Sequence, residues 1–153
     1  FAQMPSLRLE THDISYLSNR AVALYSDRGV QFSSEGPVYA SVDKEQWSRI
    51  IHNLIKNALQ SVPEDRQPEI VVRVQKEQGK GTISVSDNGT GIPDEMKERV
   101  FEPNFTTKSS GMGLGLAMVK NLIQNFGGTI AFENGKQGAV FTITIPTKQN
   151  NLS

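Results

Sequence analysis

Residues 44–62, KEQWSRIIHNLIKNALQSV, carry the longest regular pattern of apolar residues in the sequence. These apolar residues recur every three or four positions over about five turns, which predicts one long amphipathic helix with a single buried face. Asp43 is a suitable N-cap, Gln46 follows it three positions later, and Pro63 marks the end of the helix. The predicted buried face consists of Trp47, Ile50, Ile51, Leu54, Ile55, Ala58, Leu59 and Val62.

The sequence around this helix predicts strands in clusters and two shorter helices. Residues 14–28 and 115–126 have helical periodicity, and glycine follows each of them. Because the strands cluster as hairpins with helices between the clusters, the pattern favours an α+β two-layer sandwich over a doubly wound parallel sheet. Strands are expected near 7–12, at 30–32 paired with 38–42, at 69–76 and 81–87, and at 129–133 paired with 139–145 around Asn134-Gly135.

Composition narrows the class of protein. The chain has 153 residues, enough for one domain with its own core. Lys plus Arg is 16 and Asp plus Glu is 16, so charge gives no sign of a nucleic-acid or anionic-lipid partner. Cysteine is absent and only His12 and His52 are present, which excludes disulfides and argues against a zinc site. No apolar run approaches the ~20 residues of a membrane-spanning helix.

A carboxylate ends one of the predicted strands. In TISVSDNGTG, residues 82–91, side chains alternate, so Ile83, Val85 and Asp87 point the same way, toward the helix layer. An ionised group there is costly unless a partner donates hydrogen bonds to it. From this strand alone two interpretations stay open: Asp87 caps the turn formed by the glycines that follow, or it binds a ligand.

Two asparagines lie at the border of the buried face of the long helix. Asn53 and Asn57 are four positions apart and therefore share one face. One interpretation is that both are half-exposed surface amides with no ligand. The same spacing also suits an oxygen ligand for Mg²⁺ beside a phosphate, since Mg²⁺ takes few protein oxygens and keeps several waters.

A glycine-rich segment, SSGMGLGLAMVKNL at 109–122, leads into the last predicted helix. A helix N-terminus offers free N–H groups and a positive dipole end to phosphate, and glycine lets backbone approach a ligand closely. A flexible loop before a weak helix start is the alternative. Neither the Walker phosphate loop nor the dinucleotide-binding glycine pattern is present, because Met118 stands where the latter needs glycine.

Four motifs in this order resemble a known family. They are Asn53 with Asn57, DNGTG at 87–91, FEPNFTTK at 101–108 and GMGLGL at 111–116. The chain is similar to the GHKL ATPase and kinase superfamily, and most closely to the catalytic, ATP-binding domain of two-component sensor histidine kinases. The residues of the last two motifs favour kinases of the nitrogen-regulation type. The resemblance covers residues 7–147 and implies a mixed, mostly antiparallel sheet covered on one face by about three helices, with a flexible ATP lid at 94–113.

The resemblance implies a site for ATP and Mg²⁺. Asp87 would accept a hydrogen bond from the adenine amino group, whereas guanine presents an acceptor at that position. Asn57 would hold Mg²⁺ with Asn53 beside it, and Lys108 would reach a phosphate. Two further sets would contact the nucleotide: Gly89, Gly91 and Ile92 at the base, and Gly111, Met112, Gly113, Leu114, Gly115 and Leu116 at the phosphates.

Asn53 also favours transfer over hydrolysis. In the hydrolytic relatives a glutamate stands four residues before the Mg²⁺-binding asparagine and activates water. Asn53 occupies that position here and cannot act as a general base. A neutral imidazole is already a nucleophile, so the resemblance implies transfer of the γ-phosphate to a histidine, with this domain supplying positioning and charge neutralisation.

Three positions depart from the family pattern. Gln60 stands three residues after Asn57, where Lys or Arg is common, and Ala139 follows Gly138, where Ser or Thr is common. Asn104 stands where an aromatic residue is common. Gln60 and Ala139 keep open a second interpretation, a non-catalytic nucleotide-sensing or interaction module. A stand-alone GHKL serine kinase is a third.

The phosphoaccepting histidine is expected outside this sequence. His12 lies on a predicted strand without the family's phosphoacceptor motif, and His52 is expected as a solvated residue on the polar side of the long helix. The resemblance therefore implies three parts: residues 1–6 as the end of a preceding helical dimerisation domain, 7–148 as the catalytic domain and 149–153 as a tail.

The expected partners follow from the same resemblance. The domain would phosphorylate its own dimerisation and phosphoacceptor helices, and a response regulator would then take the phosphate, in a parent kinase that is a homodimer. No nucleic-acid partner and no direct membrane contact are expected for this fragment. It would be a cytoplasmic domain of a kinase anchored in the inner membrane.

Overall fold

The computed structural model describes residues 6–103 and 115–149. The helices and strands of these two ranges alternate along the chain in clusters, as the sequence predicts. In chain order they are β1 (Glu10–Asp13), α1 (Ile14–Ala23), the 3-10 helix η1 (Ser26–Arg28), β2 (Val30–Ser34), β3 (Tyr39–Val42), α2 (Lys44–Ser61), β4 (Ile70–Glu77), β5 (Lys80–Ser86), the 3-10 helix η2 (Asp94–Arg99), α3 (Leu116–Asn125), β6 (Thr129–Asn134) and β7 (Ala139–Pro146).

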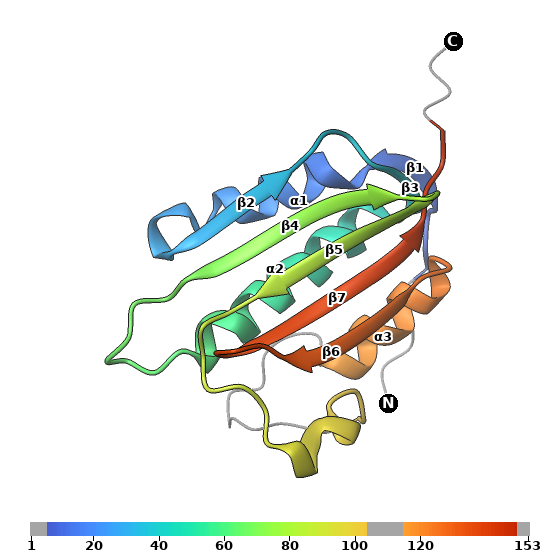
Figure 1. The fold of residues 1–153 in the computed structure, drawn as a ribbon. Coiled ribbons are helices and arrows are strands. Elements are labelled where there is room, and N and C mark those ends of the chain that lie inside the picture. The colour runs from blue at the N-terminus through green and yellow to red at the C-terminus, as the bar shows by residue number, and fades with distance from the viewer. Residues whose placement is uncertain (1–5, 104–114, 150–153) are drawn as a thin grey trace.

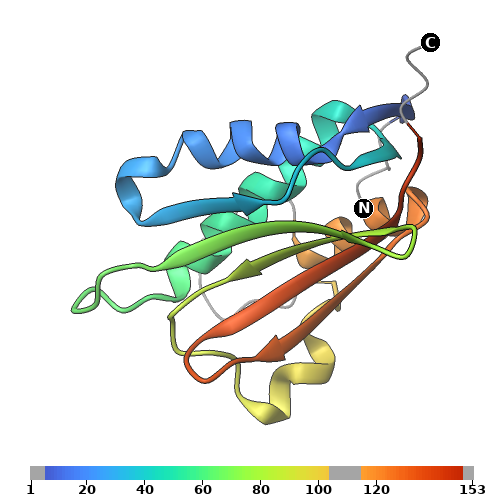
Figure 2. The same ribbon diagram turned by 45° about the horizontal axis from the view of Figure 1, so that its top comes forward.

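Five strands form one sheet in the order β2-β4-β5-β7-β6, and β1 and β3 form a separate antiparallel pair. β2 runs parallel to β4, whereas the other neighbours in the large sheet are antiparallel. Helices α1, α2 and α3 lie side by side on one face of this sheet (Figures 1 and 2). The predicted α+β two-layer sandwich, with a mixed and mostly antiparallel sheet, is confirmed.

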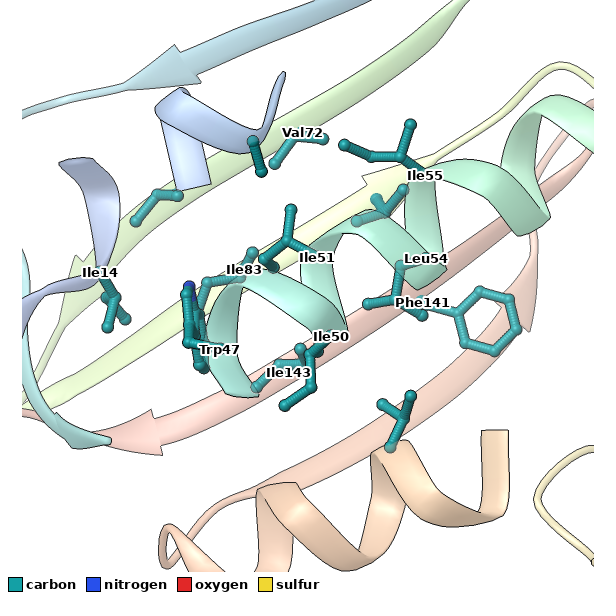
Figure 3. Packing of buried hydrophobic residues seen from close by; sticks show 14 of the residues in the cluster. Ile14, Trp47, Ile50, Ile51, Leu54, Ile55, Val72, Ile83, Phe141 and Ile143 are labelled. Atoms are coloured by element: carbon teal, nitrogen blue, oxygen red, sulfur yellow. The ribbon is translucent and has the colours of Figure 1, made fainter. Parts of the chain in front are cut away.

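Helix α2 lies at the centre of the core. Its buried face packs toward the sheet, where Figure 3 shows Ile83 of β5 and Ile143 of β7. The helix contributes Trp47, Ile50, Ile51 and Leu54 to this core. These four side chains are at most 1% exposed, so the helical periodicity of the sequence corresponds to real burial. The indole Nε1 of Trp47 donates to Ser18 Oγ of α1 at 3.0 Å, which satisfies its polar atom inside the core.

Asp43 fixes the start of α2, as predicted. Its Oδ1 accepts a hydrogen bond from the Gln46 N–H at 3.0 Å, and its Oδ2 accepts one from the Arg8 N–H at 2.9 Å. Burial opposes the charged form, but these backbone donors prevail and hold the pKa of Asp43 below its ordinary value. The helix ends at Ser61, one residue before the predicted end.

The predicted pairing of 30–32 with 38–42 is wrong. β2 pairs in parallel with β4, and β3 pairs with β1 in the small sheet. Contacts around Asp13 explain the difference. The Val38 N–H donates to Asp13 Oδ1 at 3.2 Å, and the Ile14 N–H donates to the Val38 carbonyl at 2.8 Å. These bonds hold the chain before β3 against β1 and away from β2.

The first strand and the first helix are shorter than predicted. β1 begins at Glu10, and α1 ends at Ala23, after which the chain forms η1. Gly29 ends this segment with a φ of +84°, and a Cβ there would lie 2.2 Å from the Pro68 carbonyl oxygen. Glycine is therefore required at the predicted stop, although the residues before it leave the α-helical conformation early.

Candidate functional site

Asp87 follows β5 directly and is 8% exposed. Ile83 and Val85, which precede it at alternate positions of the strand, are buried, and Asp87 is buried with them. Its Oδ1 accepts hydrogen bonds from the Gly89 N–H at 2.8 Å and from the Ala139 N–H at 3.2 Å. A carboxylate is thus held at the end of a central strand by backbone donors, which lowers the cost of burying its charge.

Residues 87–92 form what we call the Asp87 turn, and two glycines in it are required by close approach to other parts of the protein. A Cβ on Gly89 would lie 2.5 Å from the carbonyl oxygen of Ser61, the last residue of α2. Gly91 has a φ of +75°, and a Cβ there would lie 2.8 Å from Asn134 Oδ1. Both glycines therefore let the Asp87 turn pack against helix and hairpin, a reason that does not depend on a ligand.

The last residue of α2 and the segment after it hold the Asp87 turn from one side. The Thr90 N–H donates to the Ser61 carbonyl at 3.2 Å. The Arg66 guanidinium donates to the carbonyl oxygens of Asn88 and Gly89. The Asn88 amide in turn accepts from the Glu69 N–H and donates to the Gln67 carbonyl, both at 2.8 Å. The sequence analysis singled out the glycines of the Asp87 turn but none of these hydrogen bonds, because the bonds join segments that lie about twenty or more residues apart.

Asn53 and Asn57 lie on α2 in its second half. Asn53 is buried, at 7% exposure, and Asn57 is half-buried, so both lie where the buried face of the helix meets the exposed face. Asn57 is one turn before Ser61, which contacts the Asp87 turn, and this brings the predicted metal ligand to the same end of the sandwich as the carboxylate. Amide oxygens at this edge suit a hard cation that keeps water and phosphate oxygens among its ligands.

Much of the predicted phosphate-binding segment lies outside the described residues. Lys108, Gly111, Met112, Gly113 and Leu114 fall there, as does Asn104. The described part begins again at Gly115, which is exposed and is the N-cap of α3, and Leu116 is the first helical residue. No side-chain hydrogen bond caps this N-terminus among the described residues.

Phe101, the first residue of the third motif, ties that motif to the sheet and to α3. Its ring meets Phe141 of β7 edge-on, with centroids 6.1 Å apart. Lys120 Nζ of α3 lies 5.5 Å from the centroid of the same ring. The aromatic residue therefore has a structural partner on each side, and the adjacent Val100 is fully buried.

A surface hollow of about 280 Å³ lies elsewhere on α2, lined by Arg28, Lys56, Leu59 and Gln60. None of its lining residues is Asp87, Asn53 or Asn57. By helical phase Gln60 lies next to Asn53 on α2, so the hollow borders the edge on which the two asparagines lie.

His52 is not the solvated surface residue that the sequence predicts. Its Nδ1 is 3.1 Å from the Tyr25 hydroxyl, and the two rings are tilted with centroids 5.6 Å apart. Burial, together with the charge of Lys56, lowers the pKa of His52, and burial raises the pKa of Tyr25 against the opposing charge of Arg28. The helical wheel missed this contact because η1 and α1 cover that flank of α2. His12 lies on β1 at the other sheet.

The class of protein is a two-layer sandwich with a buried carboxylate at the end of a central strand, packed next to the last residue of a helix that carries two asparagines. The family comparison then identifies it. Residues 42–149 match the family model described as histidine kinase-, DNA gyrase B- and HSP90-like ATPase, and the chain belongs to this family.

Relatives in this family include sensor kinases. The sensor histidine kinase ZraS of Escherichia coli is 34% identical over 150 residues, covering 92% of this chain and 31% of that protein. The nitrogen regulation protein NtrY of Azorhizobium caulinodans is also 34% identical, over 147 residues, covering 90% of this chain and 19% of that protein. The chain therefore spans less than one third of the length of these two relatives. Because the two relatives have the same sequence identity to this chain, the comparison does not single out kinases of the nitrogen-regulation type.

Solved structures have the same fold. The catalytic domain of histidine kinase ThkA superposes with a TM-score of 0.82 at 28% identity, covering 92% of this chain and 96% of that domain. ThkA in complex with the response regulator TrrA matches with a TM-score of 0.77 at 25% identity, covering 92% of this chain and 42% of that chain. The predicted resemblance to histidine kinase catalytic domains is confirmed.

Proposed function

We propose that this domain binds Mg²⁺-ATP and transfers the γ-phosphate to a histidine on a separate helical dimerisation domain. The observation that carries the proposal is the buried Asp87 carboxylate, held by backbone donors at the end of β5 and joined to the end of α2 that bears Asn57. Membership of a family of histidine kinase-like ATPases supports it.

Asp87 would select adenine. A carboxylate accepts hydrogen bonds and donates none, so it matches the amino group of adenine and opposes the carbonyl oxygen that guanine has at the same place. Gly91 and Ile92 would lie against the base. A buried acceptor left without its donor rejects the wrong ligand strongly, and the expected preference for ATP over GTP is therefore large.

Asn57, with Asn53 beside it, would hold Mg²⁺ against the phosphates. Lys108 and the segment from Gly111 to Leu116 would contact the phosphates. Bound Mg²⁺ would supply charge neutralisation on the transferred group. The chain's own residues would bind and orient the nucleotide; neither asparagine can remove a proton, and an imidazole acceptor requires none to be removed by this domain.

The departure at Ala139 does not remove support for this function. Ala139 lacks a hydroxyl group, but its backbone N–H donates to Asp87 Oδ1 and its carbonyl accepts from the Asp87 N–H at 3.0 Å. The contact between this position and the carboxylate is therefore made by backbone, which any residue other than proline provides.

We further propose the arrangement of the parent protein. Residues 1–6 would end a preceding helical dimerisation domain, 7–148 would be the catalytic domain, and 149–153 a tail. The acceptor histidine would pass phosphate to a response regulator, as the complex of ThkA with TrrA suggests for that kinase. Among the described residues no helix combines the length and the apolar character that a membrane span requires. The parent would be a homodimer anchored in the inner membrane, with this domain in the cytoplasm.

A calorimetric titration of the domain with ATP and with GTP, each with and without Mg²⁺, tests the proposal. The expected result is binding of ATP, strengthened by Mg²⁺, with GTP binding much weaker or absent. Asp87→Asn should lose most of the ATP affinity, because an amide rotated to accept from adenine would turn its NH₂ group toward the Gly89 and Ala139 N–H groups and lose both of these donors. ATP affinity unchanged in Asp87→Asn would overturn the assignment of Asp87.

A further inference from the structure

We infer that Asn134 is a positioning residue for the nucleotide base, acting through the backbone of Ile92. The inference deepens the proposed function and rests on it, because Ile92 is assigned to the base side of that site. Asn134 stands at the end of β6, where the sequence suggests only a turn residue before Gly135. In the structure its side chain does not serve the turn but reaches the Asp87 turn.

The contact is a reciprocal pair of hydrogen bonds. Asn134 Oδ1 accepts from the Ile92 N–H at 3.0 Å, and Asn134 Nδ2 donates to the Ile92 carbonyl oxygen at 2.9 Å. A side-chain amide satisfies both backbone groups of one residue, which requires a donor and an acceptor on the same planar group. Aspartate has the shape but no donor when ionised, and serine has neither the reach nor the fork.

The conformation of the preceding residue matches this contact. Gly91 has a φ of +75°, in the left-handed region, and a Cβ on it would lie 2.8 Å from Asn134 Oδ1. The two hydrogen bonds from Asn134 therefore hold the residue that follows Gly91, whose backbone conformation glycine adopts readily and other residues rarely adopt. Without the two hydrogen bonds, Gly91 has other conformations of similar energy, and Ile92 would not keep one position.

The same hairpin positions both ends of the Asp87 turn. At its first end Ala139, the first residue of β7, donates to Asp87 Oδ1 at 3.2 Å. At its last end Asn134, which pairs with Ala139 in the sheet register, holds Ile92. One rigid pair of strands thus sets the separation between the carboxylate and the backbone of Ile92, the two groups assigned to the edge and the face of the base.

The test compares Asn134→Ala and Asn134→Asp with Gln137→Ala, which changes an exposed residue of the same hairpin loop. Calorimetry gives the ATP affinity of each variant in the presence of Mg²⁺, and amide hydrogen exchange gives the protection of the Ile92 N–H without nucleotide. Asn134→Ala should lose that protection and bind ATP about ten-fold more weakly, because Ile92 would no longer be held in the free domain and ordering it would oppose binding. Gln137→Ala should match the wild type in both.

Asn134→Asp separates positioning from space filling. It keeps the volume and one acceptor but turns a second acceptor toward the Ile92 carbonyl, so it should bind ATP as weakly as Asn134→Ala. Wild-type affinity in either Asn134 variant would overturn this inference while leaving the proposed function intact. A wild-type domain that binds no ATP would instead overturn the proposed function, and the base-positioning role with it.

Discussion

Gly138 lies directly against Asp87. A Cβ built on Gly138 would stand 2.1 Å from the Asp87 carbonyl oxygen and 2.4 Å from its Oδ1, and the φ of Gly138 is +79°. Steric contact and backbone conformation therefore both require glycine at this position. The residue that precedes β7 shapes the end of β5, and with it the orientation of the candidate adenine-binding carboxylate.

Gly138→Ala should damage both the fold and the site. We expect a loss of about 2–4 kcal/mol in the free energy of unfolding, because the new methyl group meets backbone as well as the carboxylate. ATP affinity should fall as well, since Asp87 must move. Urea denaturation and calorimetry measure the two effects. Gly135→Ala is the matched control: a Cβ there meets nothing closer than 3.7 Å, and it should cost little. Equal stability of the two variants would contradict the prediction.

Asn57→Ala should chiefly remove the dependence of ATP binding on Mg²⁺. The half-buried amide is the proposed metal ligand, so its loss should bring the affinities measured with and without Mg²⁺ together, while nucleotide binding without metal changes little. The measurement is a pair of ATP titrations on the variant. Arg49→Ala, an exposed change two turns earlier on α2, should keep the wild-type difference. If Asn57→Ala keeps it too, Asn57 is not the ligand.

Asp43→Asn should destabilise the domain by about 1 kcal/mol at neutral pH, because an amide can keep the cap to the Gln46 N–H but turns an NH₂ group toward the Arg8 N–H and loses that hydrogen bond. The sign of the pH dependence follows from the lowered pKa: a depressed carboxyl pKa stabilises the fold above the ordinary value of 3.8, and this stabilisation is lost as the pH falls through the lower folded-state value. The difference between wild type and variant, measured by urea denaturation, should therefore shrink below that pH. A difference that stays constant down to about pH 2 would show that the charge of Asp43 is not involved.

His52→Gln should flatten the pH dependence of stability near neutrality. Burial lowers the pKa of His52, so the unfolded chain binds a proton more readily than the folded domain. Its neutral form therefore favours folding fully above about pH 6.5, and stability should decrease as the pH falls below that value. Denaturation of wild type and variant between about pH 7.5 and 5.5 measures the difference. Identical slopes in the two proteins would refute a titrating role for His52.

The candidate site was only partly predictable. Asp87 and the asparagine pair could be found because each departs from a local rule: a charge on the buried side of a strand, and amides at the border of an apolar helix face. Asn134 could not be found this way. A turn signal, asparagine before glycine, already explains it, and its hydrogen bonds run to Ile92, 42 positions away in the sequence. Arg66 was missed because its hydrogen bonds run to Asn88 and Gly89, 22 and 23 positions away in the sequence.

The elements with local signals could be predicted from the residues alone. The period of α2 and the alternation along β5 are geometric properties of a helix and a strand, so they specified which side chains are buried before any partner was known. Three features emerged only in the folded chain: β2 joins β4 in parallel, His52 contacts Tyr25, and one hairpin holds both ends of the Asp87 turn. Those contacts join separate segments, and a single sequence carries no measure of which segments meet.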